Sequence, residues 1–132
     1  MLTVTSFTAA LLALMFVALT WNVVQSRFRV EAVFGDGGDD LLNRAIRAHG
    51  NFAEYVPLFL ILLALQELAG VSSFLLVLQG VALLAARGMH AYSLLKVEVA
   101  NPKRVRYRIY AMRTQLGLLV TGAVILLAML LL

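Results

Sequence analysis

Four apolar stretches constrain the fold of this chain more than any other feature of its sequence. Three of them carry no charged side chain: Phe7–Val24, Leu68–Ala86 and Thr114–Leu132. The fourth, Tyr55–Leu65, is shorter and follows a polar segment. A helix needs about 20 consecutive apolar residues to cross the hydrocarbon core of a bilayer. The pattern therefore predicts an all-α integral membrane protein, a bundle of four spanning helices.

The length of the chain leaves room for little else. Of its 132 residues, 62% are hydrophobic, and four spans with short connections use almost all of them. We expect a single domain over residues 1–132, with spans at about 2–26, 41–69, 72–97 and 102–131. Residues 1–26 lack a basic n-region, which favours a retained span over a signal peptide. There is no cysteine, so disulfides and thiolate metal sites are excluded.

Residues that end and begin helices mark the connections between the spans. The glycines and aspartates of VFGDGGDD predict a long first loop, with Asp39 or Asp40 capping the second helix. Pro57 lies inside the second span, where its missing N–H favours a kink. Asn101 and Pro102 are typical of an N-cap followed by proline at the first helical position. We therefore expect the last helix to begin there.

Basic residues gather in the first loop and the third connection, which two spans place on the same side of the membrane. These residues are Arg27, Arg29, Arg44, Arg47, Lys96, Lys103, Arg104, Arg106 and Arg108. The opposite side has Glu67 and both termini. The positive-inside rule predicts that loops 1 and 3 are cytoplasmic and both termini extracytoplasmic. The net charge of +4 is explained by this topology, and we expect no nucleic-acid partner.

The second span begins with a polar stripe. Arg44, Arg47, Asn51 and Glu54 follow the spacing i, i+3, i+7, i+10, which places them on one narrow face of a helix. Charged side chains are costly inside a span, and they persist mainly where they pair, face a bundle interior or do chemistry. The stripe therefore predicts one wall of a polar site.

Further polar groups are expected near the same depth on the other helices. Arg27 ends the first span, Arg87 and His90 lie three residues apart on the third, and the fourth opens with a basic segment. Such an excess of guanidinium groups suits a small anionic ligand, because arginine binds carboxylates bidentately. Positive surroundings also stabilise a thiolate. Two histidines without a carboxylate cluster predict no metal site.

The same residues have purely structural interpretations. Glu54 with Arg87 or Arg47 would form an ion pair that only holds helices together. His90 would cross-link helices by a hydrogen bond. Basic side chains at span ends reach lipid phosphates by default, and the tyrosines of the last helix fit an interfacial aromatic belt.

The motif R-x-x-R-A-H-x-N-x-x-E-x-x-P, from Arg44 to Pro57, resembles the MAPEG family, membrane-associated proteins in eicosanoid and glutathione metabolism. The resemblance covers nearly the whole chain and includes A-R-x-x-H near the end of the third span. The first loop and the motif look most like the small bacterial inner-membrane members. The resemblance implies a homotrimer in the inner membrane, with glutathione bound between neighbouring subunits.

The resemblance also implies roles for individual residues. Those that match the glutathione-binding pattern are Arg27, Asn51, Glu54 and His90. Arg104 resembles the arginine that supports the thiolate, with Tyr107 or Tyr110 as a second donor. Those that match structural or pocket-lining positions are Arg44, Arg47 and Arg87. Glutathione would be the co-substrate, with no metal.

The chain departs from the family at three positions. Gly50 stands where some transferases carry an arginine that contacts glutathione. Leu94 replaces a tyrosine of prostaglandin synthase, and Val105 replaces a serine implicated in some members. These departures argue against prostaglandin synthesis in particular.

The leading prediction is a membrane-bound protein resembling a glutathione transferase or peroxidase, with a cytoplasm-facing site. It would join glutathione thiolate to a hydrophobic electrophile, or reduce a lipid hydroperoxide, with the substrate entering from the membrane lipids. The alternative is a non-enzymatic protein of the same fold that binds lipid or a small anion. A small multidrug transporter is disfavoured, because such proteins usually carry an acidic residue in the first span and Phe7–Val24 has none.

Overall fold

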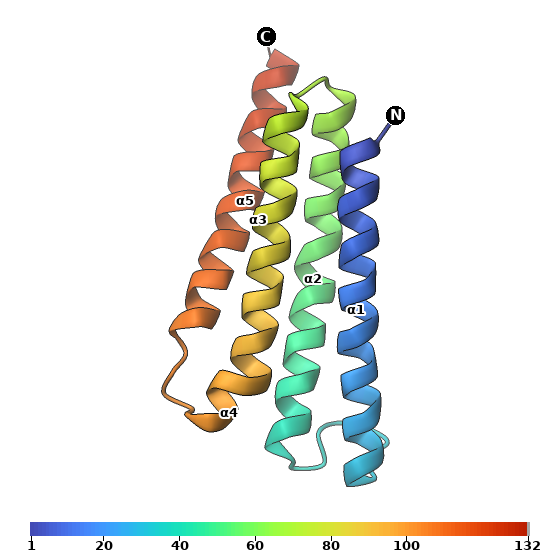
Figure 1. The fold of residues 1–132 in the computed structure, drawn as a ribbon, viewed down its shortest axis with the longest axis vertical. Coiled ribbons are helices and arrows are strands. Elements are labelled where there is room, and N and C mark those ends of the chain that lie inside the picture. The colour runs from blue at the N-terminus through green and yellow to red at the C-terminus, as the bar shows by residue number, and fades with distance from the viewer. Residues whose placement is uncertain (132) are drawn as a thin grey trace.

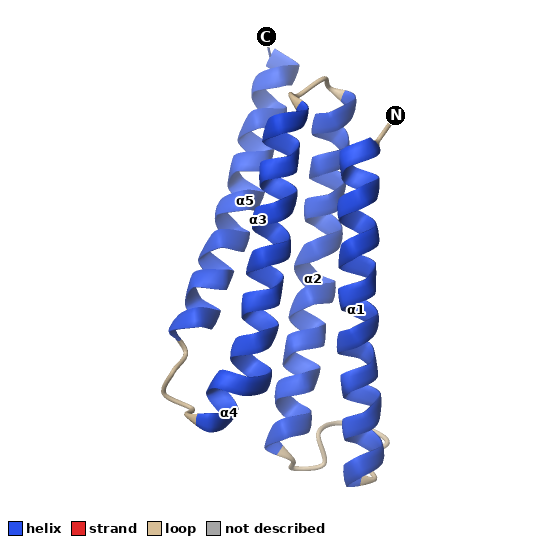
Figure 2. Ribbon diagram, viewed as in Figure 1, coloured by secondary structure: helices blue, strands red, loops and turns tan. Residues whose placement is uncertain are grey.

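The computed structural model describes residues 1–131, which form a bundle of four long helices (Figures 1 and 2). The elements are α1 (Thr3–Val30), α2 (Asp40–Leu68), α3 (Ser73–Tyr92), the π-helical turn η1 (Ser93–Val97), α4 (Glu98–Ala100) and α5 (Arg106–Leu131). Because α3, η1 and α4 follow one another without a break, they act as one long third helix. All four long helices have the length and apolar character needed to cross a membrane. The predicted all-α membrane class is thus confirmed.

The helices pack so that α1 contacts α2 and α3, while α5 contacts α3 and α2. Both termini lie at one end of the bundle, together with the short α2–α3 connection (Figure 1). The α1–α2 loop and the α4–α5 connection lie at the other end, which we call the basic end. This arrangement agrees with the predicted pairing of loops 1 and 3. Which side of the membrane the basic end faces stays a prediction.

Small residues let the helices approach closely. The core is formed by buried apolar side chains such as Leu12, Phe59, Leu63 and Leu83. At Gly80, an added Cβ would lie 2.6 Å from Thr8 Oγ1, so α1 and α3 touch where only glycine fits. Close backbone approach of this kind is how helices associate inside membranes, where lipid is as apolar as leucine.

At the end of the bundle where both termini lie, Glu67 of α2 caps the first turn of α1. Its carboxylate accepts the backbone N–H of Val4 at 2.9 Å, that of Thr5 at 2.8 Å and the Thr5 hydroxyl at 2.7 Å. The first turn of a helix has N–H groups without intrahelical partners, and α1 has no capping side chain of its own. Glu67 therefore supplies the missing acceptors from another helix, and its charge suits the positive end of the helix dipole.

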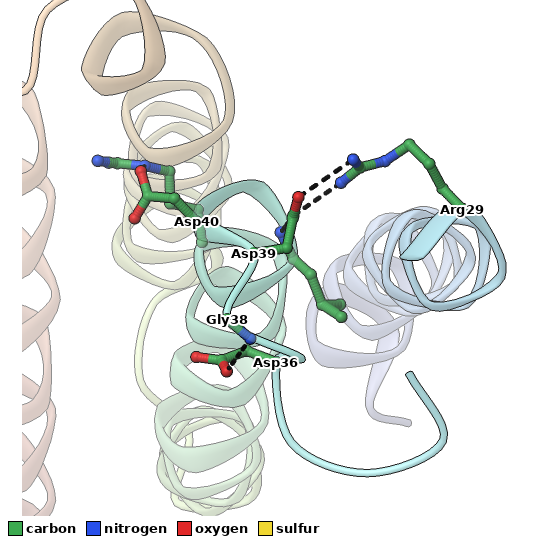
Figure 3. Close-up of polar contacts among 7 residues, drawn as sticks. Arg29, Asp36, Gly38, Asp39 and Asp40 are labelled. Carbon is green, nitrogen blue, oxygen red and sulfur yellow. Dashed lines mark hydrogen bonds and ion pairs between the residues drawn. The ribbon is translucent and has the colours of Figure 1, made fainter. Parts of the chain in front are cut away.

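At the basic end, two arginines of α1 hold the first loop, and Figure 3 shows one of them, Arg29, against Asp39. Arg29 binds Asp39 through two contacts, Nη1–Oδ2 at 3.2 Å and Nη2–Oδ1 at 2.8 Å. Asp39 also accepts the Leu42 N–H at 2.7 Å, so Asp39 and not Asp40 caps α2. Arg27 donates to the carbonyls of Ala32, Val33 and Gly35 at 3.1–3.3 Å, which closes the loop against the end of α1.

Three helix boundaries differ from the prediction. The last helix begins at Arg106 and not at Pro102, because Asn101 forms a turn instead of a cap. Its side-chain oxygen accepts the Lys103 N–H at 3.1 Å and its carbonyl accepts the Arg104 N–H at 2.9 Å. Asn-Pro favours both structures, and the turn is the one formed. The first helix continues to Val30, and the third continues through η1 to Ala100.

Candidate anion site between α2, α3 and α5

The main concave site is a cleft at the basic end, with a volume of about 560 Å³. We call it the arginine cleft. It opens between α2 and α5, with η1 and the end of α3 behind them. Its lining residues are Asp40, Asn43, Arg44, Arg47, Asn51, His90, Leu94, Val105, Arg108, Ile109, Met112, Arg113 and Leu116. One part of this lining is polar and the rest apolar, as expected of a site for a small amphiphilic molecule.

Four arginines determine the charge of the cleft. Arg44 and Arg47 come from the first turns of α2, and Arg108 and Arg113 come from the facing part of α5. Asp40 is the only acidic residue of the lining, and it accepts Arg44 Nε at 2.9 Å. The lining therefore carries a net positive charge, and a cleft with walls of low dielectric concentrates its field on an anion.

A fifth arginine lies beneath the cleft and orients one of its ligating groups. Arg87 is 1% exposed, and its Nη1 donates to Asn51 Oδ1 at 2.7 Å. A guanidinium is only a donor, so this contact requires that the oxygen of the Asn51 amide faces Arg87. The amide nitrogen then presents its two N–H donors on the other side, and Asn51 lines the cleft. This geometry adds neutral donors to a site that favours anions.

Two of the structural interpretations do not match the contacts of the described residues. Arg87 bonds Asn51 and Met112 Sδ, not Glu54, so the predicted Glu54–Arg87 ion pair is not formed. His90 is buried and lines the cleft. Among the described residues its ring makes no hydrogen bond that would cross-link the helices.

The acidic residue that joins the elements around the cleft was not predicted from the sequence. Glu98 is 2% exposed, and its Oε1 accepts the Ser93 hydroxyl at 2.9 Å and Arg108 Nε at 3.1 Å. Its Oε2 lies 3.7 Å from Arg44 Nη1. Glu98 thus connects α4, η1, α5 and α2. Its place in the polar stretch KVEVANPKR is typical of an exposed loop, so the sequence alone carried no signal of its burial.

Several predicted site residues lie outside the cleft of their own chain. Arg27 binds the first loop, and Glu54 is exposed on α2, one turn beyond Asn51. Arg104 is exposed in the turn before α5. Tyr107 and Tyr110 are 38% and 56% exposed. At about 100° per residue, both tyrosines lie on the side of α5 that faces away from the cleft.

Comparisons with known proteins agree with the resemblance seen in the sequence. Residues 5–130 match the MAPEG family. The chain is 37% identical over 89 residues to "Inner membrane protein YecN" of Escherichia coli strain K12, covering 67% of this chain and 68% of that protein. The protein of the same name from Escherichia coli O6:H1 matches to the same extent.

The match extends over all four spanning helices and includes the stripe on α2 and the lining of the arginine cleft. The name of the E. coli relatives, together with four apolar helices, supports an inner-membrane location. This chain is an integral membrane protein of the MAPEG family.

Proposed function

We propose that the chain binds glutathione in the arginine cleft and joins its thiolate to a hydrophobic electrophile. The observation that carries the proposal is the meeting of Arg44, Arg47, Arg108 and Arg113 with the N–H donors of Asn51 in one cleft. Ionised glutathione has two carboxylates and a thiolate against one ammonium group. Guanidinium groups pair with each of these anions, and the excess of arginine matches the excess of negative charge.

In the transfer, the thiolate sulfur attacks an electrophilic carbon, a carbon–sulfur bond forms, and the leaving group departs with the electron pair of the broken bond. A guanidinium beside the sulfur keeps it ionised near neutral pH. Arg108 and Arg113 are the α5 arginines that reach the cleft of their own chain. The apolar lining of Leu94, Ile109, Met112 and Leu116 suits the hydrophobic part of the electrophile.

A homotrimer, which family membership suggests, would give the remaining predicted residues a place. Glu54 is a carboxylate exposed on a spanning helix, where contact with lipid would be costly. A neighbouring subunit against this face would cover it, and Glu54 would then accept the ammonium group of glutathione. Three further residues are exposed at the basic end and would line the cleft of a neighbouring subunit, where they would support the thiolate: Arg104, Tyr107 and Tyr110.

The test is calorimetry with glutathione on the detergent-solubilised chain, together with the ultraviolet absorbance of the thiolate. Two alanine variants separate the cleft of one chain from a site that needs a neighbour, Arg108→Ala and Arg104→Ala. Lys103→Ala, exposed in the same turn as Arg104, is the matched control. We expect weaker binding in both arginine variants and unchanged binding in the control. The absence of wild-type binding at millimolar glutathione would refute the proposal.

The second candidate is a non-enzymatic protein that binds a small anion or a lipid headgroup in the same cleft. The observation that favours it is that the cleft of one chain lacks the predicted Glu54, Arg104 and tyrosines. It predicts glutathione-independent binding of simple anions and no turnover of chlorodinitrobenzene or hydroperoxides. Turnover that disappears in Arg108→Ala would exclude it.

A further inference from the structure

The π-helical turn η1 orients a buried acid toward the arginine cleft. Its backbone closes with the Glu98 N–H donating to the Ser93 carbonyl, five residues back. One extra residue in a helical turn rotates everything after it by about 100°. Glu98 is therefore directed into the bundle between α2 and α5. Turns of this kind occur frequently at functional sites.

Glu98 contacts two of the four cleft arginines, although Glu98 itself does not line the cleft. The Nε of Arg108 donates to Glu98 at 3.1 Å. The Nε of Arg44 donates to Asp40 at 2.9 Å, and its Nη1 lies 3.7 Å from Glu98 Oε2. Both Nη nitrogens of Arg108 and the Nη2 of Arg44 make no hydrogen bond with the rest of the described chain. The lining residues do not include Glu98. Glu98 thus holds the Nε side of Arg108 and leaves both Nη nitrogens of Arg108 for a ligand. Asp40 and Glu98 together hold Arg44 and leave its Nη2.

We propose that Glu98 is a positioning residue that fixes Arg44 and Arg108 in the orientation needed for the planar carboxylates of the ligand. This inference rests on the proposed glutathione site and adds to it a residue that touches no ligand. The expected effect of Glu98 on carboxylate binding is opposite to the effect that its negative charge alone would have. A buried negative charge near the cleft lowers the affinity for anions in general, whereas alignment of the guanidinium edges raises the affinity for carboxylates.

These two effects can be separated by comparing two anions. A carboxylate gains from a fixed guanidinium edge because two of its oxygens pair with it, while chloride is a single sphere and gains mainly from net charge. We expect Glu98→Gln to weaken glutathione binding about tenfold, the size of coupling seen between residues in one network. Chloride binding should stay the same or become tighter. Glu98→Asp, which keeps the charge but shortens the side chain, should weaken glutathione less than Glu98→Gln.

The experiment is calorimetry of glutathione and sodium chloride on the full chain in detergent, for the wild type, Glu98→Gln, Arg108→Lys and the double variant. Lysine keeps the charge of Arg108 but loses the Nε contact, so Glu98→Gln should cost less glutathione affinity in the Arg108→Lys background than it costs in the wild type. Glu67→Gln, which changes an acid at the opposite end, is the matched control. Tighter binding of both anions in Glu98→Gln, an equal loss of both, or no change would each overturn the inference.

A second readout does not depend on glutathione. Phenylglyoxal modifies arginine side chains, and mass spectrometry reports the rate for each one. Arg44 and Arg108 should react several times faster in Glu98→Gln, with Arg27 unchanged because loop carbonyls hold it. If Arg44 and Arg108 react at the same rates in Glu98→Gln as in the wild type, the role of Glu98 is refuted even if glutathione does not bind. If Glu98→Gln does not fold, Ser93→Ala keeps the carboxylate and should shift both readouts in the same direction by less.

Discussion

Ser93 and Glu98 are joined twice, once through the backbone and once through their side chains. The Glu98 N–H donates to the Ser93 carbonyl, and the Ser93 hydroxyl donates to Glu98 Oε1 at 2.9 Å. The first bond closes the π-helical turn and the second fixes the carboxylate that holds Arg108. A local irregularity of the backbone is thereby tied to the geometry of the arginine cleft. At the opposite end of the bundle a carboxylate also holds backbone groups, because Glu67 of α2 accepts the N–H groups of Val4 and Thr5.

The capping of α1 by Glu67 should contribute measurably to the free energy of unfolding. Glu67→Ala removes three acceptor contacts from the first turn of α1 and should destabilise the fold by about 1–2 kcal/mol. Denaturant titration in detergent micelles measures this difference. Glu31→Gln, an exposed acid at the other end of the same helix, should change the value little. A neutral result for Glu67→Ala would show that lipid or water serves the N–H groups equally well.

Gly80 should tolerate no larger side chain unless Thr8 is reduced as well. An alanine Cβ would lie 2.6 Å from Thr8 Oγ1, so Gly80→Ala should destabilise by about 1–3 kcal/mol through forced separation of α1 and α3. Gly117→Ala is the matched control, because nothing lies within 4 Å of its added Cβ. Removing glycine there should stabilise the helix by about 0.5–1 kcal/mol. The double change Gly80→Ala with Thr8→Ala should recover most of the loss, and a failure to recover would contradict the contact.

The stability of the first loop should depend on pH through Asp39. The Arg29 guanidinium, and next the Leu42 N–H, hold the pKa of the Asp39 carboxyl below its ordinary value. A depressed folded pKa means that this contribution is complete above the unfolded pKa of about 3.9. It is lost as the pH falls from there through the folded pKa. Because the pair is exposed, the effect should be small and weakened by salt.

The measurement for Asp39 is the thermal midpoint between pH 2 and pH 6 in the wild type and in Asp39→Asn. The difference between the two chains should shrink as the pH falls, because the wild-type carboxyl loses its charge. Asparagine can still cap α2, so the variant isolates the ion pair from the cap. A constant difference over this range would show that the carboxylate charge contributes nothing.

The general fold could be predicted because its causes are local and periodic. The spans follow from continuous apolar stretches of the chain. The loop breakers and the cap at Asp39 act within a few residues of where they stand. The stripe on α2 followed from helical spacing, and it does place Arg44, Arg47 and Asn51 on one cleft wall. The last helix starts later than expected because Asn-Pro begins a helix or a turn with the same two residues.

The parts of the site that could not be predicted depend on long-range or irregular geometry. Glu98 points into the bundle only because η1 adds a residue to the turn before it. Arg113 reaches the cleft because α5 begins at Arg106 and faces α2, and no local pattern distinguishes Arg113 from its basic neighbours. Glu67 meets Thr5 across 62 residues of sequence, a contact set by the packing of α1 on α2.

The buried amides of the core should respond to substitution with opposite signs. Gln66 and Gln79 bond each other at 2.9 Å and 3.4 Å, so both amides are largely satisfied. Gln115 is fully buried, yet its oxygen and nitrogen have no partner among the described residues. Burying an unpaired polar group costs desolvation free energy that no hydrogen bond offsets. In a hydrogen-bonded pair, removing one partner leaves the other buried and unsatisfied.

Gln79→Leu leaves the Gln66 amide without its partner and should destabilise the fold by about 1–3 kcal/mol. Gln115→Leu removes an unpaired amide and replaces it with an apolar side chain of similar size, so the free energy of unfolding should rise or stay the same. Denaturant titration of the two variants gives the comparison. A loss of stability in Gln115→Leu equal to that in Gln79→Leu would mean that Gln115 is also hydrogen-bonded in the membrane, through water held in the core.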